Sequence, residues 1–219
     1  MSYRAAFVLT LSLGAAGCAA PGDLGQSLVG PIHSAIDRTQ PTVVARRVEI
    51  AEIPSPSSAS LTDRRIRNLI DDRTEVLSMQ ASRNRLSLVE PDGCQSTRFK
   101  DWFSPSVAWS GCGTSRNWHK ARAEVDVLES LYPLRIGATG QYRRFATSHT
   151  GKCSERTTNC LVRDAVTLDL GRRDADAFEV RCDDGRVERV TWYAPGEGPI
   201  AYREAHHRTG VREAWVLAD

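Results

Sequence analysis

The C-terminal stretch FEVRCDDGRVERVTWYAPGEGPIAYREAHHRTGVREAWVLAD (178–219) decides the fold. Apolar and polar residues alternate along it, which is the period of a strand with one covered face. The apolar sets are Phe178, Val180 and Cys182, then Val190, Trp192 and Ala194. Turn sequences separate the sets at Asp184-Gly185, at APGEGP (194–199) and at Thr209-Gly210. This pattern predicts a meander of consecutive hairpins.

The turn at 194–199 has its own chemistry. Pro195 fixes φ, while Gly196 and Gly198 permit backbone conformations that other residues avoid. We interpret these three residues as a structural turn between two strands.

Similar alternation begins further upstream. Leu134, Ile136 and Ala138 alternate, as do Val166, Leu168 and Leu170. Arg85–Val89 reads as another strand, and Pro91-Asp92-Gly93 ends it. From Pro133 onward we therefore expect an antiparallel sheet with one apolar face.

Two segments show helical spacing instead. Leu61–Met79 places Ile66, Leu69, Ile70 and Leu77 on one face, with Ser60 or Thr62 as a cap. Asn117–Leu131 places Trp118, Ala121, Val125 and Leu128 on one stripe. The expected fold is mostly β with minor α: a curved antiparallel β-meander packed with one or two helices.

The N-terminus resembles an export signal. Arg4 gives Met1–Gly17 a positive charge, Ala5–Leu13 is apolar, and small residues precede Cys18. Such small residues before a cysteine predict a lipoprotein signal peptide at 1–17 and a lipidated Cys18. The alternative is an ordinary secretory signal with an incidental cysteine. Since Ala, not Asp, follows Cys18, we expect a lipid-anchored protein of the outer membrane facing the periplasm.

The mature chain divides simply. Residues 18–60 are rich in Pro, Gly and Ser and are expected to be a lipidated, flexible tether, with one short strand within 42–50. Residues 61–219 have the length of a single globular domain. The partner implied by the N-terminus is a membrane, joined through the lipid anchor, and envelope proteins are possible partners.

Charge and composition exclude some functions. The chain has 29 Lys and Arg against 27 Asp and Glu, so it has no basic field for nucleic acid. The cysteines and histidines lack the spacing of a metal site, because there is no Cys-x-x-Cys pair. We expect no cofactor.

The remaining cysteines fit an oxidising compartment. Cys94 with Cys112, and Cys153 with Cys160, would each close a short polar loop. Cys182 lies in an alternating apolar segment, and we expect it to be a buried free thiol.

Several stretches carry a resemblance. They are LYPLRIG (131–137), GQYRRF (140–145), FEVRC (178–182), TWYAPGEGPIAYRE (191–204) and REAWVLAD (212–219). In this order they resemble a group of mostly uncharacterised exported bacterial β-rich proteins, often lipoproteins. The resemblance covers about residues 128–219. It implies a curved antiparallel sheet and no known catalysis.

Three functional hypotheses follow. The first is a non-catalytic envelope lipoprotein with a structural, assembly or ligand-holding role and no catalytic residues. The second is a peptidoglycan-active enzyme, in which Cys153 in SHTGKC (148–153), or Cys112 beside His119, would be the nucleophile. The third is an accessory subunit of a pilus or secretion machine.

Overall fold

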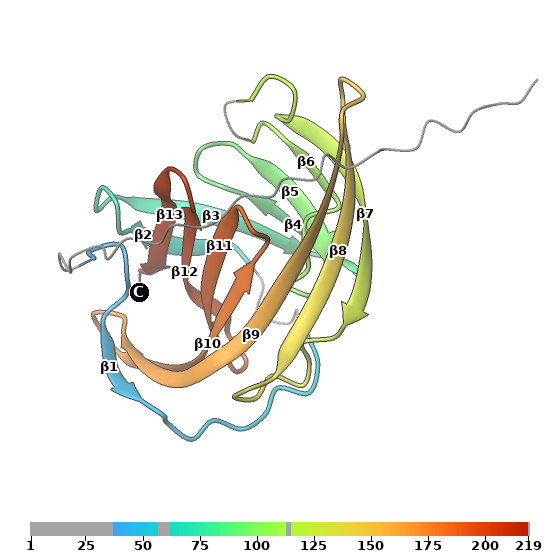
Figure 1. Ribbon diagram of the computed structural model, residues 1–219. Helices are drawn as coiled ribbons and strands as arrows, with labels where there is room; N and C mark the ends of the chain where they lie inside the picture. Colours follow the sequence, from blue (N-terminus) through green and yellow to red (C-terminus); the bar gives the residue numbers. More distant parts are fainter. Residues whose placement is uncertain (1–36, 57–61, 113–114, 219) are drawn as a thin grey trace, which may run out of the picture.

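The computed structural model describes residues 37–56, 62–112 and 115–218, and within them it contains thirteen strands and no helix (Figure 1). The strands are β1 (Val43–Arg46), β2 (Arg64–Asn68), β3 (Thr74–Ala81), β4 (Arg85–Val89), β5 (Gln95–Phe99), β6 (Ala108–Ser110), β7 (Lys120–Glu129), β8 (Thr139–Ser148), β9 (Cys153–Asp169), β10 (Asp174–Asp183), β11 (Val187–Ala194), β12 (Gly198–His206) and β13 (Gly210–Leu217).

The strands close into an antiparallel barrel. Neighbours follow in the order β8-β9-β10-β11-β12-β13-β2-β3-β4-β5-β6-β7, and β7 pairs with β8 again. Strand β1 pairs with the second half of β9, outside this ring. Because the ring is closed, none of its twelve strands has an open edge. A meander packed on helices would have two open edges.

The predicted helices are therefore wrong. Residues 64–81 form the hairpin β2–β3, whose turn includes Asp72 with a φ of 61°. Ile66 and Leu77 are buried inside the barrel, while Ile70 is an exposed turn residue. The helical spacing of these apolar residues arose from two strands and the turn between them.

The second expected helix is strand β7. Its register with β8 pairs Ala121 with Ser148 and Val125 with Arg144. Its inward positions alternate with charged outward ones such as Arg122 and Glu124. The pairing of β7 with its neighbours thus overrides the helical spacing of only four apolar residues.

The meander at the C-terminus is confirmed. Residues 174–217 form β10–β13 as consecutive antiparallel hairpins. Gly185, Gly196 and Gly210 take positive φ in the three turns, as the turn sequences predicted. Residues 133–138, by contrast, form no strand, and Leu134 makes only an isolated bridge to Ile53.

The loop between β5 and β6 folds into the barrel. Trp102, Phe103 and Ser104 are buried, although they belong to a connection. The Trp102 Nε1–H donates to Thr191 Oγ1 at 3.2 Å, and the Tyr142 hydroxyl donates to an Asp101 carboxylate oxygen at 2.6 Å. These contacts with β11 and β8 make the loop an internal plug, here called the plug loop (101–104).

The plug loop separates two kinds of interior. On one side lie packed apolar side chains, including Val162, Phe178, Val180 and Ile200. The Phe103 ring packs on the Tyr193 ring at 5.5 Å on this side. On the other side, toward the β4–β5 and β10–β11 turns, the interior is polar.

Part of the expected tether packs on the barrel. Figure 1 shows β9 curving beneath β10 toward β1. Arg46 of β1 forms an ion pair with Asp164, and Asp37 forms one with Arg203 on the outside of β12. Trp192, on the outer face of β11, is 3% exposed. Residues 37–56 therefore belong to the folded unit.

The structure corrects the disulfide pairing. It joins Cys94 to Cys112, the pairing that the sequence favoured, and it joins Cys160 to Cys182. The expected Cys153–Cys160 bridge and the expected free thiol at Cys182 are both wrong. Residues 153–160 are one continuous strand, so its ends are about 23 Å apart. Cys160 and Cys182 are direct cross-strand neighbours.

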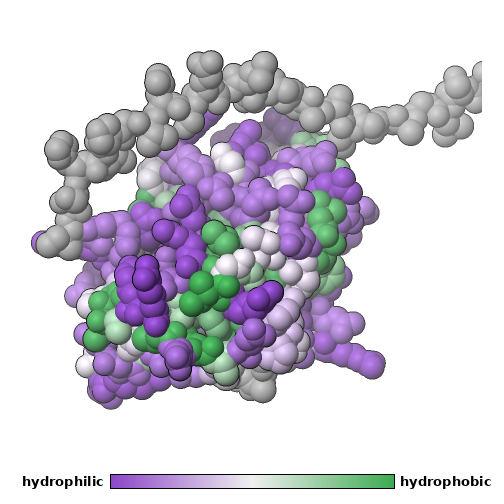
Figure 2. Space-filling view, turned by 60° about the horizontal axis from the view of Figure 1, so that its bottom comes forward, coloured by the Kyte–Doolittle hydropathy of each residue, from purple (hydrophilic) through white to green (hydrophobic). Residues whose placement is uncertain are grey.

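The outer surface is mostly polar. Figure 2 brings the underside of the barrel forward and shows apolar side chains gathered in the middle of that face, with polar ones around them. Exposed large apolar residues occur on several elements, among them Val44 on β1 and Phe145 on β8. The described part of the chain has no helix that could cross a bilayer.

Candidate functional site

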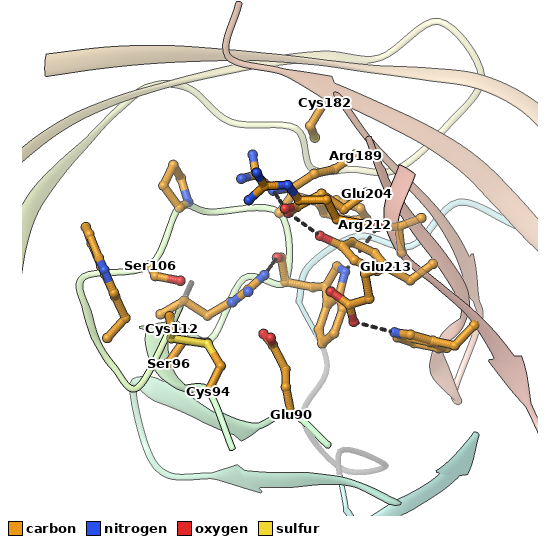
Figure 3. Close-up of a pocket in the computed structure, with 18 of the residues that line it drawn as sticks. Glu90, Cys94, Ser96, Ser106, Cys112, Cys182, Arg189, Glu204, Arg212 and Glu213 are labelled. Atoms are coloured by element: carbon orange, nitrogen blue, oxygen red, sulfur yellow. Dashed lines mark hydrogen bonds and ion pairs between the residues drawn. A yellow bond between two sulfur atoms is a disulfide. The ribbon is translucent and has the colours of Figure 1, made fainter. Parts of the chain in front are cut away.

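A polar cavity occupies the barrel interior beyond the plug loop. Its volume is about 460 Å³. Figure 3 shows Glu90 reaching into it from the β4–β5 turn and Glu213 from β13, with Arg189 and Glu204 on the neighbouring strands. The space has the size of sites that take small organic molecules.

Aromatic side chains form the floor and one wall. The ring of Trp102, from the plug loop, meets Tyr202 edge-on at 6.4 Å between centroids. Tyr202 stacks on Trp215 at 5.7 Å. Tyr202 and Trp215 are cross-strand partners on β12 and β13, so strand register places the two rings together.

Arg189 lies in a charge network on one wall. Its Nε–H donates to Glu204 Oε2 at 2.9 Å, and its Nη1 lies 3.5 Å from Asp184. Burial works to raise the pKa of Asp184, but the Arg189 charge and two backbone N–H donors outweigh burial, so the pKa falls. Arg189 and its two carboxylates therefore satisfy one another.

Arg98 and Arg144 differ from Arg189 because their guanidinium groups contact aromatic rings and not carboxylates. Arg98 Nη1 donates to the Trp102 carbonyl at 2.7 Å, and its guanidinium lies over the Trp102 ring at 5.0 Å. Arg144 lies over the Trp109 ring at 5.3 Å. Within the described chain neither guanidinium forms an ion pair with a carboxylate. Burial lowers the pKa of both groups.

Glu90 and Glu213 form an acidic part of the same cavity. Burial raises the pKa of each, and their mutual repulsion raises that of Glu213 further. Glu213 accepts a hydrogen bond from Trp215 Nε1–H at 2.9 Å. No described cationic side chain forms an ion pair with either one.

Two buried polar atoms on the cavity wall have no partner. They are Ser96 Oγ on β5 and Arg98 Nε on the same strand. A buried polar atom without a hydrogen bond is costly, and such atoms are rare in folded proteins. A bound molecule or ordered water would satisfy them.

The residues predicted from the sequence lie mostly at the edges of this cavity. Cys94, Cys112 and Cys182 are part of its lining, but all three are in disulfides. Cys153 is exposed at the start of β9 and is also not a free thiol. Cys18 lies outside the described residues.

The predicted turn and histidines are not part of the cavity. Pro195, Gly196 and Gly198 lie at the far end of β11, away from the charged residues. His149 and His119 contact each other on the surface, with ring centroids 4.4 Å apart.

One cluster has the donor types of a metal site. Glu90, Asp92 and Cys94 bring their ligand atoms within 4.8 Å of one another. The sulfur of Cys94, however, is bonded to Cys112 and cannot supply a thiolate. These residues do not fit a metal centre.

The charged lining was not predicted from the sequence. Arg98, Arg144, Glu204 and Glu213 occupy inward positions of β5, β8, β12 and β13. One sign of it in the sequence is that some charged residues lie two positions from an apolar one on the same strand, as Glu204 does from Tyr202 on β12. Two such residues point to the same face. Without knowledge of closure, those positions read as a solvated strand end.

Comparison with protein families, with curated proteins and with solved structures finds no match for this chain.

Proposed function

We propose that this protein is a non-catalytic, ligand-holding lipoprotein of the cell envelope, anchored through Cys18, whose barrel binds a small organic molecule. The cavity beyond the plug loop is the binding site. The anchor would hold the barrel at the periplasmic face of the outer membrane.

One observation carries the binding proposal. Two buried polar atoms on the cavity wall, Ser96 Oγ and Arg98 Nε, have no hydrogen-bond partner, and the Arg144 guanidinium beside them has no carboxylate partner among the described residues. Unpaired polar groups destabilise a folded chain unless something binds them. A ligand site is the arrangement in which such groups are retained.

The cysteine-enzyme hypothesis receives less support. Cys112 is bonded to Cys94, and a sulfur in a disulfide is not a nucleophile. Cys153, the other expected nucleophile, is not a free thiol either.

A cavity-filling variant tests the binding proposal. Anilinonaphthalene sulfonate should bind the wild-type protein with one-to-one stoichiometry in a fluorescence titration. Ser96→Phe places a ring in the cavity and should abolish that binding. Ser87→Phe, on the outer face of the neighbouring strand β4, is the matched control and should bind as the wild type does. Equal binding by the two variants, or no binding at all, would contradict the proposal.

A labelling experiment tests the anchor. Cells that express the protein in the presence of a radioactive fatty acid should yield a labelled mature chain, and Cys18→Ser should remove the label. A mature wild-type chain without label would rule out the lipoprotein.

A further inference from the structure

We infer that the ligand is a zwitterion, whose carboxylate is bound by Arg98 and Arg144 and whose ammonium group is bound by Glu90 and Glu213. This inference rests on the proposed function and names the chemical class of the ligand. Three features of the cavity carry it.

The first feature is the basic part. Arg98 has one nitrogen held by the Trp102 carbonyl, which fixes the guanidinium and leaves its Nε–H unpaired. A planar guanidinium held in this way is suited to a carboxylate, which can accept two parallel hydrogen bonds. Arg144 adds a second cation from β8, fixed over Trp109. Neither arginine forms an ion pair with a carboxylate among the described residues, although the charges of Arg98 and Glu90 act on each other.

The second feature is the acidic part. Glu90 and Glu213 face the cavity in Figure 3, and the carboxylates of Glu204 and Asp92 also act on Glu213. Two glutamates that repel each other at a half-buried site favour a cation between them. Asp184 and Glu204 are already paired with Arg189, and Glu75 accepts a hydrogen bond from Asn68. Among the lining carboxylates this leaves Glu90 and Glu213, with Asp92 exposed at the rim, for an ammonium group.

The third feature is the aromatic surface beside the charged groups. Trp102, Tyr202 and Trp215 form a continuous series of ring contacts along the floor and wall. An apolar or aromatic body of the ligand would pack on these rings. The charges of Arg98 and Glu90 act on each other, so groups of opposite sign lie close together beside these rings. Such an arrangement matches an amino acid with an aromatic side chain, whose ammonium and carboxylate groups are on one carbon.

Four indole compounds of similar size test the inference by calorimetry. Tryptophan carries both charges, indolepropionate carries only the carboxylate, tryptamine carries only the ammonium, and skatole carries neither. Tryptophan should bind most tightly, and removal of either charged group should weaken binding about tenfold or more.

Variants assign each charge to its site. The Arg144→Gln variant should bind tryptophan no more tightly than it binds tryptamine. The Glu213→Gln variant should bind tryptophan no more tightly than it binds indolepropionate. Arg122→Gln removes an exposed arginine on β7, the strand paired with β8, and should change nothing. Circular dichroism and the melting temperature show whether each variant is folded.

The possible failures differ from one another. If tryptophan binds no more tightly than skatole, or less tightly than a singly charged compound, the zwitterion is overturned while the binding function stands. If no indole binds but anilinonaphthalene sulfonate does, the inference is again the part that fails. If Ser96→Phe leaves anilinonaphthalene sulfonate binding intact, the proposed function itself fails.

Discussion

The two halves of the barrel interior differ sharply, although the same strands build both. On one side of the plug loop, β10 and β12 contribute Phe178 and Ile200 to a core from which water is excluded. On the other side, β12 contributes Glu204 and β13 contributes Glu213 to an open polar cavity. On β12 the lining changes from apolar at Ile200 to charged at Glu204, four positions further on.

This contrast separates stability from function. Apolar burial stabilises the packed half at about 25 cal/mol for each Å² removed from water. The polar half places charges where desolvation opposes them, and among its described arginines Arg189 alone has carboxylate partners. The packed half should therefore hold the fold. In the polar half, replacing a residue that has no ion pair should change stability little but weaken binding.

The largest expected effect is in the packed half. Phe178 is 2% exposed, and Phe178→Ala should lower the free energy of unfolding by about 3–5 kcal/mol. Arg144→Gln in the polar half should change it by less than about 0.5 kcal/mol. Urea denaturation measures both. A large loss at Arg144 would remove the distinction between the halves.

The next effect concerns the bridge between β9 and β10. Replacing both Cys160 and Cys182 with Ser should lower the free energy of unfolding by about 3 kcal/mol, because the bridge closes a loop in the unfolded chain. The loop is similar in size to that of Cys94–Cys112, with sequence separations of 22 and 18. The double variant of Cys94 and Cys112 should therefore show a comparable loss under the same denaturation, and an unchanged midpoint for either would contradict this account.

A smaller effect is expected at the Arg189–Glu204 pair. Glu204→Gln should lower the free energy of unfolding by about 1–2 kcal/mol, because Arg189 keeps its charge but loses a partner. Solvent reaches both side chains, which reduces the effect below that of a fully buried pair. A double-mutant cycle with Arg189→Met measures the coupling. A coupling energy near zero would show that the pair does not act as a unit.

A further effect is a pH dependence. Burial raises the pKa of Glu213 and Glu90 in the folded protein, so the folded state holds more protons than the unfolded state above the ordinary pKa of glutamate. Stability should then fall as pH rises from about 5 to about 8. Glu213→Gln should reduce this slope in melting temperatures measured across the range. A slope equal to that of the wild type would show that Glu213 does not titrate in this range.

The sequence predicted the C-terminal strands well because their alternation and turn residues are local signals. Phe178–Cys182 and Val190–Ala194 lie in β10 and β11 as expected. The expectation of one apolar face was wrong, because Phe178 pairs with Tyr193 and points inward, whereas Trp192 is buried on the outer face. Residues 61–79 failed because apolar residues of two short strands and their turn imitated a helical stripe. The chain gives no local sign of the hairpin there apart from Asp71-Asp72.

Closure and the cavity could not be predicted in the same way. The pairing of β7 with β8 and of β8 with β9 joins segments whose contacts depend on the whole ring. The Cys160–Cys182 bridge depends on register between strands, whereas the sequence favoured neighbours in a loop. Arg98 and Glu213 become cavity residues only when closure puts their faces inside.

The most direct test of the central claim is the nitrogen-15 NMR signal of the Arg98 Nε–H group during a titration with tryptophan. The cavity account predicts that this signal and that of Arg144 shift and reach saturation at one equivalent, while the signal of the exposed Arg122 stays in place. Unchanged Arg98 and Arg144 signals at saturating tryptophan, or an equal shift at Arg122, would contradict it.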